Sequence, residues 1–377
     1  MQNHILALVA CLIMTTMSAC TQAKTFISEK HRFEVVTVAQ GLEHPWSLAF
    51  LPDGTLLVTE RPGRLRVINK GQLRPQAVTG LPGNIAAVGQ GGLLDVALHP
   101  AFASNRLLYF SYAGHGEGGI GTEVARARLS PAASRLENLE VIFRALPKSR
   151  GGRHFGSRLV FGTDDYLYIT LGDRGDMWRA QDLNDHAGSV IRLNDDGSVP
   201  ASNPFLQQAT ARPEIFTSGN RNVQGATLQP DTGLIWIQEH GPRGGDEINI
   251  PKPGKNYGWP NASYGVHYSM LPIKDEHAEQ GYEEPVYYWT PSVAPSGMLF
   301  YTGGLFPGWR GNLFVGTLAG QHLIRLSTSH DKVLSEEQLL QNTLRFRDVE
   351  QGPDGAIYLL TDEPDGKILK LVPAGKQ

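Results

Sequence analysis

Short runs of aliphatic and aromatic residues alternate along the chain with polar segments that are rich in turn-forming residues. In each repeat a turn containing Pro, Asp, Asn or Gly comes first, a strand-like run follows, and a polar loop and often a second run come next. Proline fixes φ, Asp and Asn hydrogen-bond to their own backbone, and Gly accepts positive φ, so this order predicts paired strands joined by tight turns. It recurs six times, in residues 51–68, 99–113, 161–175, 228–250, 306–326 and 351–371.

Six similar units at roughly regular spacing are typical of a radial repeat. We expect an all-β fold, a six-bladed β-propeller with about four strands per blade, formed as a single domain by residues 30–374. The wider spacing after the third and fourth units predicts inserted loops that form the mouth of an active site. A β-sandwich is the alternative, but it does not account for the repeated phrase. One segment, SEEQLLQN at residues 335–342, has a helical pattern instead.

The first 20 residues have the pattern of an export signal. An apolar run at residues 5–14 ends in small residues before Cys20 and is too short to span a membrane. MSAC at residues 17–20 is similar to a bacterial lipoprotein cleavage box, although Met17 is unusual there and no Lys or Arg precedes the apolar run. We favour lipidation of Cys20, which predicts a periplasmic protein with a lipid anchor in the outer membrane. Ordinary cleavage nearby, giving a periplasmic protein without the anchor, is the alternative.

Composition narrows the function classes. Both cysteines, Cys11 and Cys20, lie in this leader, so the domain that follows has no disulfide and no thiol nucleophile. The net charge of −3 without a long basic run gives no electrostatic reason to expect nucleic acid as a partner. The chain has no G-x-G-x-x-G between a strand and a helix, no P-loop and no G-x-S-x-G, which argues against Rossmann nicotinamide binding, nucleotide hydrolysis and α/β-hydrolase chemistry.

One histidine, His154, lies in the loop GGRHFGSR among glycines and arginines. Glycines allow the backbone to approach a ligand closely. Arg153 and Arg158 disfavour the imidazolium, and a neutral imidazole near its own pKa is suited to removing a hydroxyl proton. A loop histidine is more often a surface or hydrogen-bonding residue, so His154 is a candidate general base that needs support from its neighbours.

Two other loops carry ligand-binding chemistry. In GNRNVQG, Arg221 beside Asn222 offers a fork of donors for a carboxylate or quinone oxygen, with a polar turn as the alternative. In EHGPRGGDEIN, residues 239–249, Gly241 and Pro242 present carbonyl oxygens and carboxylates follow at Asp246 and Glu247. Carbonyl and carboxylate oxygens suit Ca²⁺, although the spacing fits no EF-hand and an acidic hairpin turn is the alternative.

Three weaker signals complete the candidates. Gln90 lies between glycines in GQGGLLD, and Arg345 and Arg347 in RFRDV point to the same side of a strand, where they suit an anion with several carboxylates. Tyr287 and Trp289 precede a proline-rich loop, where aromatic faces can hold a flat ligand or a sugar. Each of these is more often a packing or surface residue when it occurs alone.

Taken in order, the stretches GQGGLLD, GGRHFGSRLVFG, LGDRG, RNVQG, EHGPRGGDEIN, NYGWP, PSVAPSG and RFRDV resemble the soluble glucose and sorbosone dehydrogenases that depend on pyrroloquinoline quinone (PQQ). The short loops are most similar to the periplasmic aldose sugar dehydrogenases of that family. The resemblance extends from about residue 33 to residue 372. It implies a six-bladed propeller that binds PQQ and Ca²⁺, oxidises aldose sugars at C1 to the lactone, and passes electrons to an external acceptor such as a quinone, a cytochrome or a dye.

The resemblance also implies roles for individual residues. His154 matches the general base, Arg221 and Asn222 match the pair at the reacting quinone oxygens, and Gly241 and Pro242 match the carbonyl ligands of the Ca²⁺ that PQQ binds. Further matches are to cofactor contacts and to a second calcium site. The cofactor contacts are Gln90, Thr317, Leu318, Ala319, Arg345, Phe346 and Arg347, and the second site comprises Glu247 and the backbone of Tyr257.

The chain departs from the family pattern at two positions. Ala319 stands where some members have a lysine on a cofactor carboxylate, so backbone donors of residues 317–319 are expected to replace it. Arg174 stands where glucose-specialised members have a glutamine, which favours a broad range of aldoses and makes Arg174 a candidate substrate residue with Tyr287 and Trp289. Two hypotheses from other classes remain at this point, a calcium-dependent lactonase or other hydrolase on a six-bladed propeller and a non-catalytic propeller that binds a partner.

Overall fold

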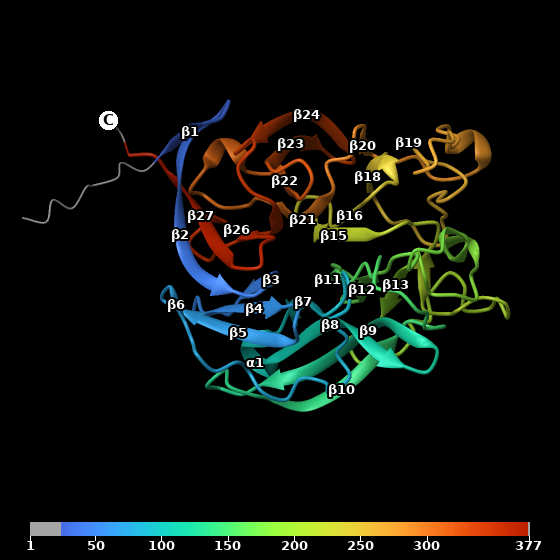
Figure 1. The fold of residues 1–377 in the computed structure, drawn as a ribbon, viewed down its shortest axis with the longest axis horizontal. Coiled ribbons are helices and arrows are strands. Elements are labelled where there is room, and N and C mark those ends of the chain that lie inside the picture. The colour runs from blue at the N-terminus through green and yellow to red at the C-terminus, as the bar shows by residue number, and fades with distance from the viewer. Residues whose placement is uncertain (1–23, 376–377) are drawn as a thin grey trace, which may run out of the picture.

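The computed structural model describes residues 24–375, and six of the seven antiparallel sheets in these residues are arranged around a central axis (Figure 1). Each of these six sheets is one propeller blade, and the seventh is a two-stranded sheet outside the blades. The first three blades are β3 (Pro45–Phe50), β4 (Leu56–Glu60), β5 (Arg64–Asn69) and β6 (Gln72–Leu73); β7 (Leu93–Leu98), β8 (Leu107–Gly116), β9 (Gly119–Leu129) and β10 (Leu136–Arg144); and β11 (Leu159–Phe161), β12 (Leu167–Thr170), β13 (Val190–Leu193) and β14 (Ile215–Thr217).

The remaining blades follow in the same order. They are β15 (Val223–Leu228), β16 (Ile235–Glu239), β18 (Asp246–Asn249) and β20 (Tyr287–Trp289); β21 (Pro295–Phe300), β22 (Leu313–Thr317), β23 (Leu323–Ser329) and β24 (Lys332–Leu339); and β25 (Phe346–Gln351), β26 (Ile357–Thr361), β27 (Gly366–Pro373), β2 (Arg32–Leu42) and β1 (Thr25–Ile27). Outside the blades lie β17 (Arg243–Gly244), β19 (Gly265–Val266), α1 (Phe102–Asn105) and the 3₁₀ turns η1 (Met177–Gln181), η2 (Ala278–Gln280) and η3 (Pro307–Trp309). The predicted six-bladed propeller is therefore confirmed.

The repeated sequence phrase marks the same place in every blade, the turn from the first strand to the second. In three of these turns an aspartate accepts a hydrogen bond from the backbone two residues further on: Asp53 from Thr55, Asp164 from Tyr166 and Asp354 from Ala356. This local bond closes the turn without help from distant residues. The first strands of neighbouring blades lie against one another around the axis, and buried side chains fill the layers between the blades.

The sixth blade combines strands from the first and the last part of the described residues. The N-terminal strand β2 pairs antiparallel with the C-terminal strand β27, from Phe33 opposite Pro373 to Leu42 opposite Gly366. Figure 1 shows β2 alongside β27, next to β26. This pairing joins the first and last parts of the described residues in one sheet, so the ring of blades has no open seam.

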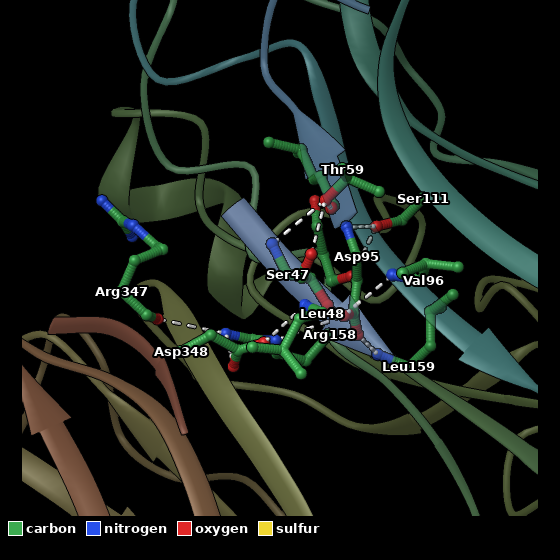
Figure 2. Close-up of polar contacts among 12 residues, drawn as sticks. Ser47, Leu48, Thr59, Asp95, Val96, Ser111, Arg158, Leu159, Arg347 and Asp348 are labelled. Carbon is green, nitrogen blue, oxygen red and sulfur yellow. Dashed lines mark hydrogen bonds and ion pairs between the residues drawn. The ribbon is translucent and has the colours of Figure 1, made fainter. Parts of the chain in front are cut away.

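A buried ion-pair network ties the first strands together at the axis (Figure 2). The guanidinium of Arg158 lies 3.2 Å from a carboxylate oxygen of Asp95 in β7 and 2.7 Å from one of Asp348 in β25. Its Nε donates to the carbonyl of Gln224 in β15 at 2.9 Å. The two carboxylates accept further hydrogen bonds from the Ser47 hydroxyl, the Leu48 amide and the Leu159 amide. Five of the six blades thus meet at one arginine.

The long insertions lie where the spacing predicted them, within the third and fourth blades. Residues 171–189 and 194–214 extend the third blade, and residues 250–286 extend the fourth. The helical expectation for residues 335–342 is wrong, because residues 332–339 form β24, which pairs along its length with β23. Pairing with a neighbouring strand here outweighs the local helical preference. The predicted leader, with Cys20, lies outside the described residues, and none of the helices in residues 24–375 is long and apolar enough to cross a membrane.

Candidate active site

A cavity of about 430 Å³ opens at one end of the central channel, where the six innermost strands begin. Residues from all six blades line it, which is the mouth that the repeat pattern predicted. Among the residues expected from the sequence, the cavity wall includes Gln90, Asn222, Leu318, Ala319, Arg345 and Arg347. Positions that are up to 257 residues apart in the chain therefore meet at one site, because each first strand delivers its starting end to the same mouth.

The cavity wall carries excess positive charge. Three guanidinium groups, from Arg61, Arg345 and Arg347, line it together with one carboxylate, Asp362. Asp362 lies 2.6 Å from Arg345 and 2.8 Å from Arg347. Burial raises the pKa of this carboxyl, but the charge of Arg347 and the hydrogen bonds from both arginines outweigh burial and lower the pKa to about 2. One carboxylate cannot neutralise three guanidinium groups, so the cavity attracts anions.

His154 lies beside this cavity and is held from two sides. Its backbone adopts φ of 54°, a left-handed conformation that is uncommon for histidine, and its amide donates to Gln90 Oε1 at 2.7 Å. Its ring Nδ1 lies 2.6 Å from Asp173 Oδ1, and Trp259 Nε1 donates to the other oxygen of Asp173 at 2.8 Å. A Cβ on Gly172 would come within 2.4 Å of the His154 carbonyl, so a glycine is needed where these two segments meet.

The contact with Asp173 decides the tautomer of His154. Burial raises the pKa of Asp173, but its hydrogen bond with His154 and the nearby charges outweigh burial and lower that pKa. An ionised carboxylate only accepts, so Nδ1 carries the proton and Nε2 keeps a free lone pair in the neutral ring. In the described chain Nε2 has no hydrogen-bond partner, and 12% of the side chain is exposed.

The pKa of His154 is lowered, as the sequence predicted, but mainly for another reason. Burial lowers it most, Asp173 raises it, and the charges of Arg221 and Arg153 lower it further. Arg158 does not contribute as expected, because its guanidinium lies in the axial network with Asp95. His154 is therefore a neutral imidazole that can accept a proton.

Asn222 lines the cavity, whereas Arg221 lines a second, small cavity together with Glu239 and Glu247. Arg221 is buried, and its guanidinium donates to the His240 carbonyl at 3.1 Å and to the Tyr268 hydroxyl at 3.3 Å, while Nε has no partner in the described chain. The side-chain oxygen of Asn222 accepts from the Gly156 amide at 3.1 Å, so Asn222 fixes the loop that follows His154. An unpartnered buried donor on Arg221 is suited to an acceptor atom of a ligand.

The segment proposed for calcium turns around a small cavity lined by Glu239, Gly241, Glu247 and Tyr257. Burial and the neighbouring charge of Glu247 raise the pKa of Glu239 to about 7. The carbonyls of Gly241, Pro242 and Tyr257 accept no hydrogen bond from the described chain. These free oxygens suit a hard cation. Within residues 24–375 no three His, Cys, Asp or Glu side chains gather as a metal site.

Asp246, which the sequence offered as a further oxygen ligand, has a different place. One of its oxygens accepts from the Gly241 amide at 2.8 Å. The other accepts from the Ser292 hydroxyl and from the amides of Val293 and Ala294. Asp246 therefore braces the two loops that flank the cavity through four hydrogen bonds.

Several predicted residues lie away from the cavity. Tyr287 and Trp289 are on the outermost strand of the fourth blade, where both donate to Glu336. The Phe346 side chain is in the core between blades, and the Thr317 hydroxyl bonds to the His322 backbone. Arg174 is buried under the His154 loop, where it donates to the carbonyls of Arg153 and Gly151 and stacks on Phe155 with 3.6 Å between the guanidinium carbon and the ring centre. In these positions the side chains support the structure around the cavity. Contacts with a ligand could come only from backbone atoms at the strand ends.

Sequence patterns did not identify several residues of the site. Trp46, Arg61, His240 and Asp362 line the cavity, and Asp173 orients His154. Asp173 lies inside the motif LGDRG, so the motif was visible but its partner was not. His240 likewise lies inside the motif EHGPRGGDEIN. Trp46, Arg61 and Asp362 belong to ordinary strand and turn sequences, and nothing in those sequences distinguishes them from surface residues. Together these features define a propeller enzyme whose cavity carries the charge to bind an anionic ligand.

Comparison with known proteins agrees with this architecture. Residues 42–370 match the family Glucose / Sorbosone dehydrogenase. The aldose sugar dehydrogenase YliI of Escherichia coli (strain K12) is 46% identical over 337 residues, which cover 88% of this chain and 91% of that protein. A crystal structure of a glucose dehydrogenase is 51% identical, with a TM-score of 0.87 over 90% of this chain and 99% of that one. The PQQ-bound aldose sugar dehydrogenase of Streptomyces coelicolor is 28% identical, with a TM-score of 0.76 over 90% and 98% of the two chains.

The protein belongs to the glucose/sorbosone dehydrogenase family and is an oxidoreductase. This confirms the family that the loop motifs indicated.

Proposed function

We propose that this protein oxidises aldose sugars at C1 to the lactone, with PQQ as the hydride acceptor, Ca²⁺ as its metal and His154 as the general base. The observation that carries the proposal is the 2.6 Å contact between His154 Nδ1 and Asp173, which leaves a free lone pair on Nε2 beside a cationic cavity. Similarity to the PQQ-bound enzyme of Streptomyces coelicolor supports the cofactor.

The charge and the apolar lining of the cavity support PQQ as its ligand. PQQ is a flat quinone with three carboxylates, and Arg61, Arg345 and Arg347 supply the positive charge that such an anion needs. Leu94, Phe155 and other apolar side chains line the same cavity and provide surface for a flat ring system. Bound PQQ supplies the two-electron acceptor, and Ca²⁺ supplies a Lewis acid at its quinone oxygen.

The protein's own part is proton transfer and positioning. His154 removes the proton of the C1 hydroxyl at Nε2, and Asp173 stabilises the imidazolium that forms, because its carboxylate accepts the Nδ1 proton. The unpartnered Nε of Arg221 would be available as a donor to the cofactor. Gly241 and Pro242 would hold the catalytic Ca²⁺ through their carbonyls, and Glu247 with the carbonyl of Tyr257 would hold a second, structural ion.

A calcium-dependent lactonase is the less favoured function. Such enzymes hold the metal with carboxylates on the propeller axis, but here the axial carboxylates Asp95 and Asp348 are paired with Arg158. We place the enzyme in the periplasm on the strength of its leader, with Cys20 as the site of a lipid anchor in the outer membrane. An external quinone, cytochrome or dye reoxidises the cofactor.

The proposal is tested with purified apoprotein and a panel of aldoses in a dye-linked assay. We expect oxidation when PQQ and Ca²⁺ are both present, and none with PQQ plus a chelator or with Ca²⁺ alone. Absorbance titration of the apoprotein with PQQ measures binding separately from turnover. Absence of both turnover and PQQ binding would contradict the proposal.

Replacing His154 by Ala tests the base. We expect kcat to fall by about 10²–10⁴-fold, because the proton acceptor is lost, whereas the affinity for PQQ in the titration stays close to that of the wild type. His330→Ala is the control, since His330 lies in the exposed turn between β23 and β24. A His154→Ala enzyme with wild-type kcat would show that another group takes the proton.

A further inference from the structure

The insertion in the fourth blade, residues 250–286, contains a small hairpin at residues 266–272 that contacts the active site through Tyr268. Val266 bridges to Pro272, the His267 amide donates to the Leu271 carbonyl at 3.0 Å, and the Met270 amide donates to the His267 carbonyl at 2.8 Å. Tyr268 lies at the tip and is 70% exposed. Its hydroxyl accepts the hydrogen bond from Arg221 at 3.3 Å. The tip is therefore a short, closed turn with one aromatic ring attached to the site.

Contacts behind the hairpin connect Tyr268 to the histidine base. The Arg221 guanidinium carbon lies 5.9 Å from the centre of the Tyr268 ring and 5.3 Å from that of Trp259. Trp259 in turn packs against His267 of the hairpin, with 6.4 Å between ring centres. Its indole nitrogen donates to Asp173, the residue that orients His154. Arg221 and Trp259 thus contact the hairpin, and Trp259 is linked to the base through Asp173.

The exposed ring of Tyr268 is suited to a sugar. An aromatic face is apolar and packs against the C–H face of a pyranose, while a fixed hydroxyl holds the ring in one orientation before the ligand arrives. The two aromatic residues that the sequence suggested for this task do not face the site, because Trp289 is only 6% exposed and both bond to Glu336. Among the described residues 24–375, Tyr268 is the aromatic side chain that combines high exposure with a direct hydrogen bond to a residue of the site.

We propose that Tyr268 is a substrate-binding residue, and that its ring forms one wall of the sugar site, against which the pyranose packs while its C1 hydroxyl faces His154. This inference rests on the proposed oxidation of aldoses. It assigns the selection among sugars to the Tyr268 side chain at the tip of the inserted hairpin, separately from the cofactor cavity.

The test compares Tyr268→Ala, Tyr268→Phe and the control Leu271→Ala in the PQQ- and Ca²⁺-loaded enzyme. Leu271 is a matched control because it is 63% exposed on the same hairpin tip. For Tyr268→Ala we expect the KM for aldoses to rise about tenfold with kcat nearly unchanged, since loss of an aromatic contact weakens sugar binding. Tyr268→Phe keeps the ring and is expected to raise the KM much less. Leu271→Ala is expected to match the wild type.

Two further measurements separate other roles of Tyr268. The KM for the dye and the affinity for PQQ should be the same in all four proteins. A rise in the dye KM would assign the hairpin to the electron acceptor, and weaker PQQ binding by Tyr268→Phe would show that the hydroxyl acts by positioning Arg221. Either result, or an unchanged sugar KM in Tyr268→Ala, would overturn the inference.

Saturation-transfer NMR of glucose with the apoprotein keeps this inference distinct from the proposed function. Sugar binding that is lost in Tyr268→Ala would support the hairpin site even if the wild type oxidised no aldose, and the proposed function alone would then fail. Oxidation by the wild type with unchanged sugar binding and KM in Tyr268→Ala would remove this inference alone. Absence of both sugar binding and oxidation in the wild type would contradict both.

Discussion

The hydrogen bond from His154 to Asp173 determines which ring nitrogen of His154 can accept a proton, and it affects the pH at which this occurs. Asp173 accepts the Nδ1 proton, so the neutral ring offers Nε2 as a base. Burial lowers the pKa of His154 below its usual 6.5, and Asp173 opposes this effect without cancelling it. The neutral, active form therefore predominates above a pKa that is lower than 6.5, and the rate is expected to rise with pH through that value.

Replacing Asp173 by Asn should change both the rate and its pH dependence. The contribution that raises the pKa of His154 is lost, so the midpoint of the rate profile moves to lower pH. The Asn side chain can also donate to Nδ1 and stabilise the wrong tautomer, so kcat should fall by about 10²-fold or more. The measurement is kcat against pH for the wild type, Asp173→Asn and Asp176→Asn, whose side chain is exposed nearby. A midpoint that moves upward in Asp173→Asn would contradict this account.

For single residues, the sequence indicated which types of side chain form the site better than it indicated which of these side chains contact one another. The phrase around His154 and the paired arginines Arg345 and Arg347 were visible, because each has a local pattern. Asp362, which pairs with both arginines, follows a different strand, and only the pairing of β25 with β26 brings it near them. The same limit explains Tyr287 and Trp289, since alternation along a strand shows which side chains share a face but not what that face packs against.

Among the elements, the first strands of the blades depend on the axial network around Arg158. Its side chain is buried with the carboxylates of Asp95 and Asp348, and burial raises the pKa of Asp348 in spite of the nearby guanidinium. Removing the cation would leave two buried carboxylates without a positive charge to pair with. The network lies below the cofactor cavity, and Arg158 also lies 4.3 Å from the ring of Trp46 in its wall.

Arg158→Met should therefore lower the free energy of unfolding by about 3–5 kcal/mol, the cost of breaking a buried pair by removing one partner. Urea unfolding followed by circular dichroism measures it. Arg135→Met is the control, because Arg135 pairs with Glu137 on the surface with 66% of its side chain exposed, and its loss should change stability by less than about 0.5 kcal/mol. Equal effects of the two changes would show that the axial network does not stabilise the fold.

The closure of the whole propeller depends on the pairing of β2 with β27. β2 completes the sixth blade beside β27, and Phe33 of β2 is buried in the core against Trp309. A chain that lacks residues 24–42 exposes the edge of β27 and opens the ring. We expect it to lose cooperative thermal unfolding and to aggregate, whereas a chain beginning at residue 30 keeps β2 and should unfold cooperatively near the wild-type temperature. Cooperative unfolding of the chain that lacks residues 24–42 would show that the ring closes without β2.

The sequence by itself determined the six turns, the short strands and therefore the propeller, because these depend on residues a few positions apart. It also determined which loops carry the chemistry, since glycine, histidine and arginine clusters are local. The tertiary structure decided which of these groups meet: Asp173 with His154, Asp362 with two arginines, and Tyr268 with Arg221. Contacts between distant segments depend on how blades and insertions pack in three dimensions, and no pattern along the chain records that packing.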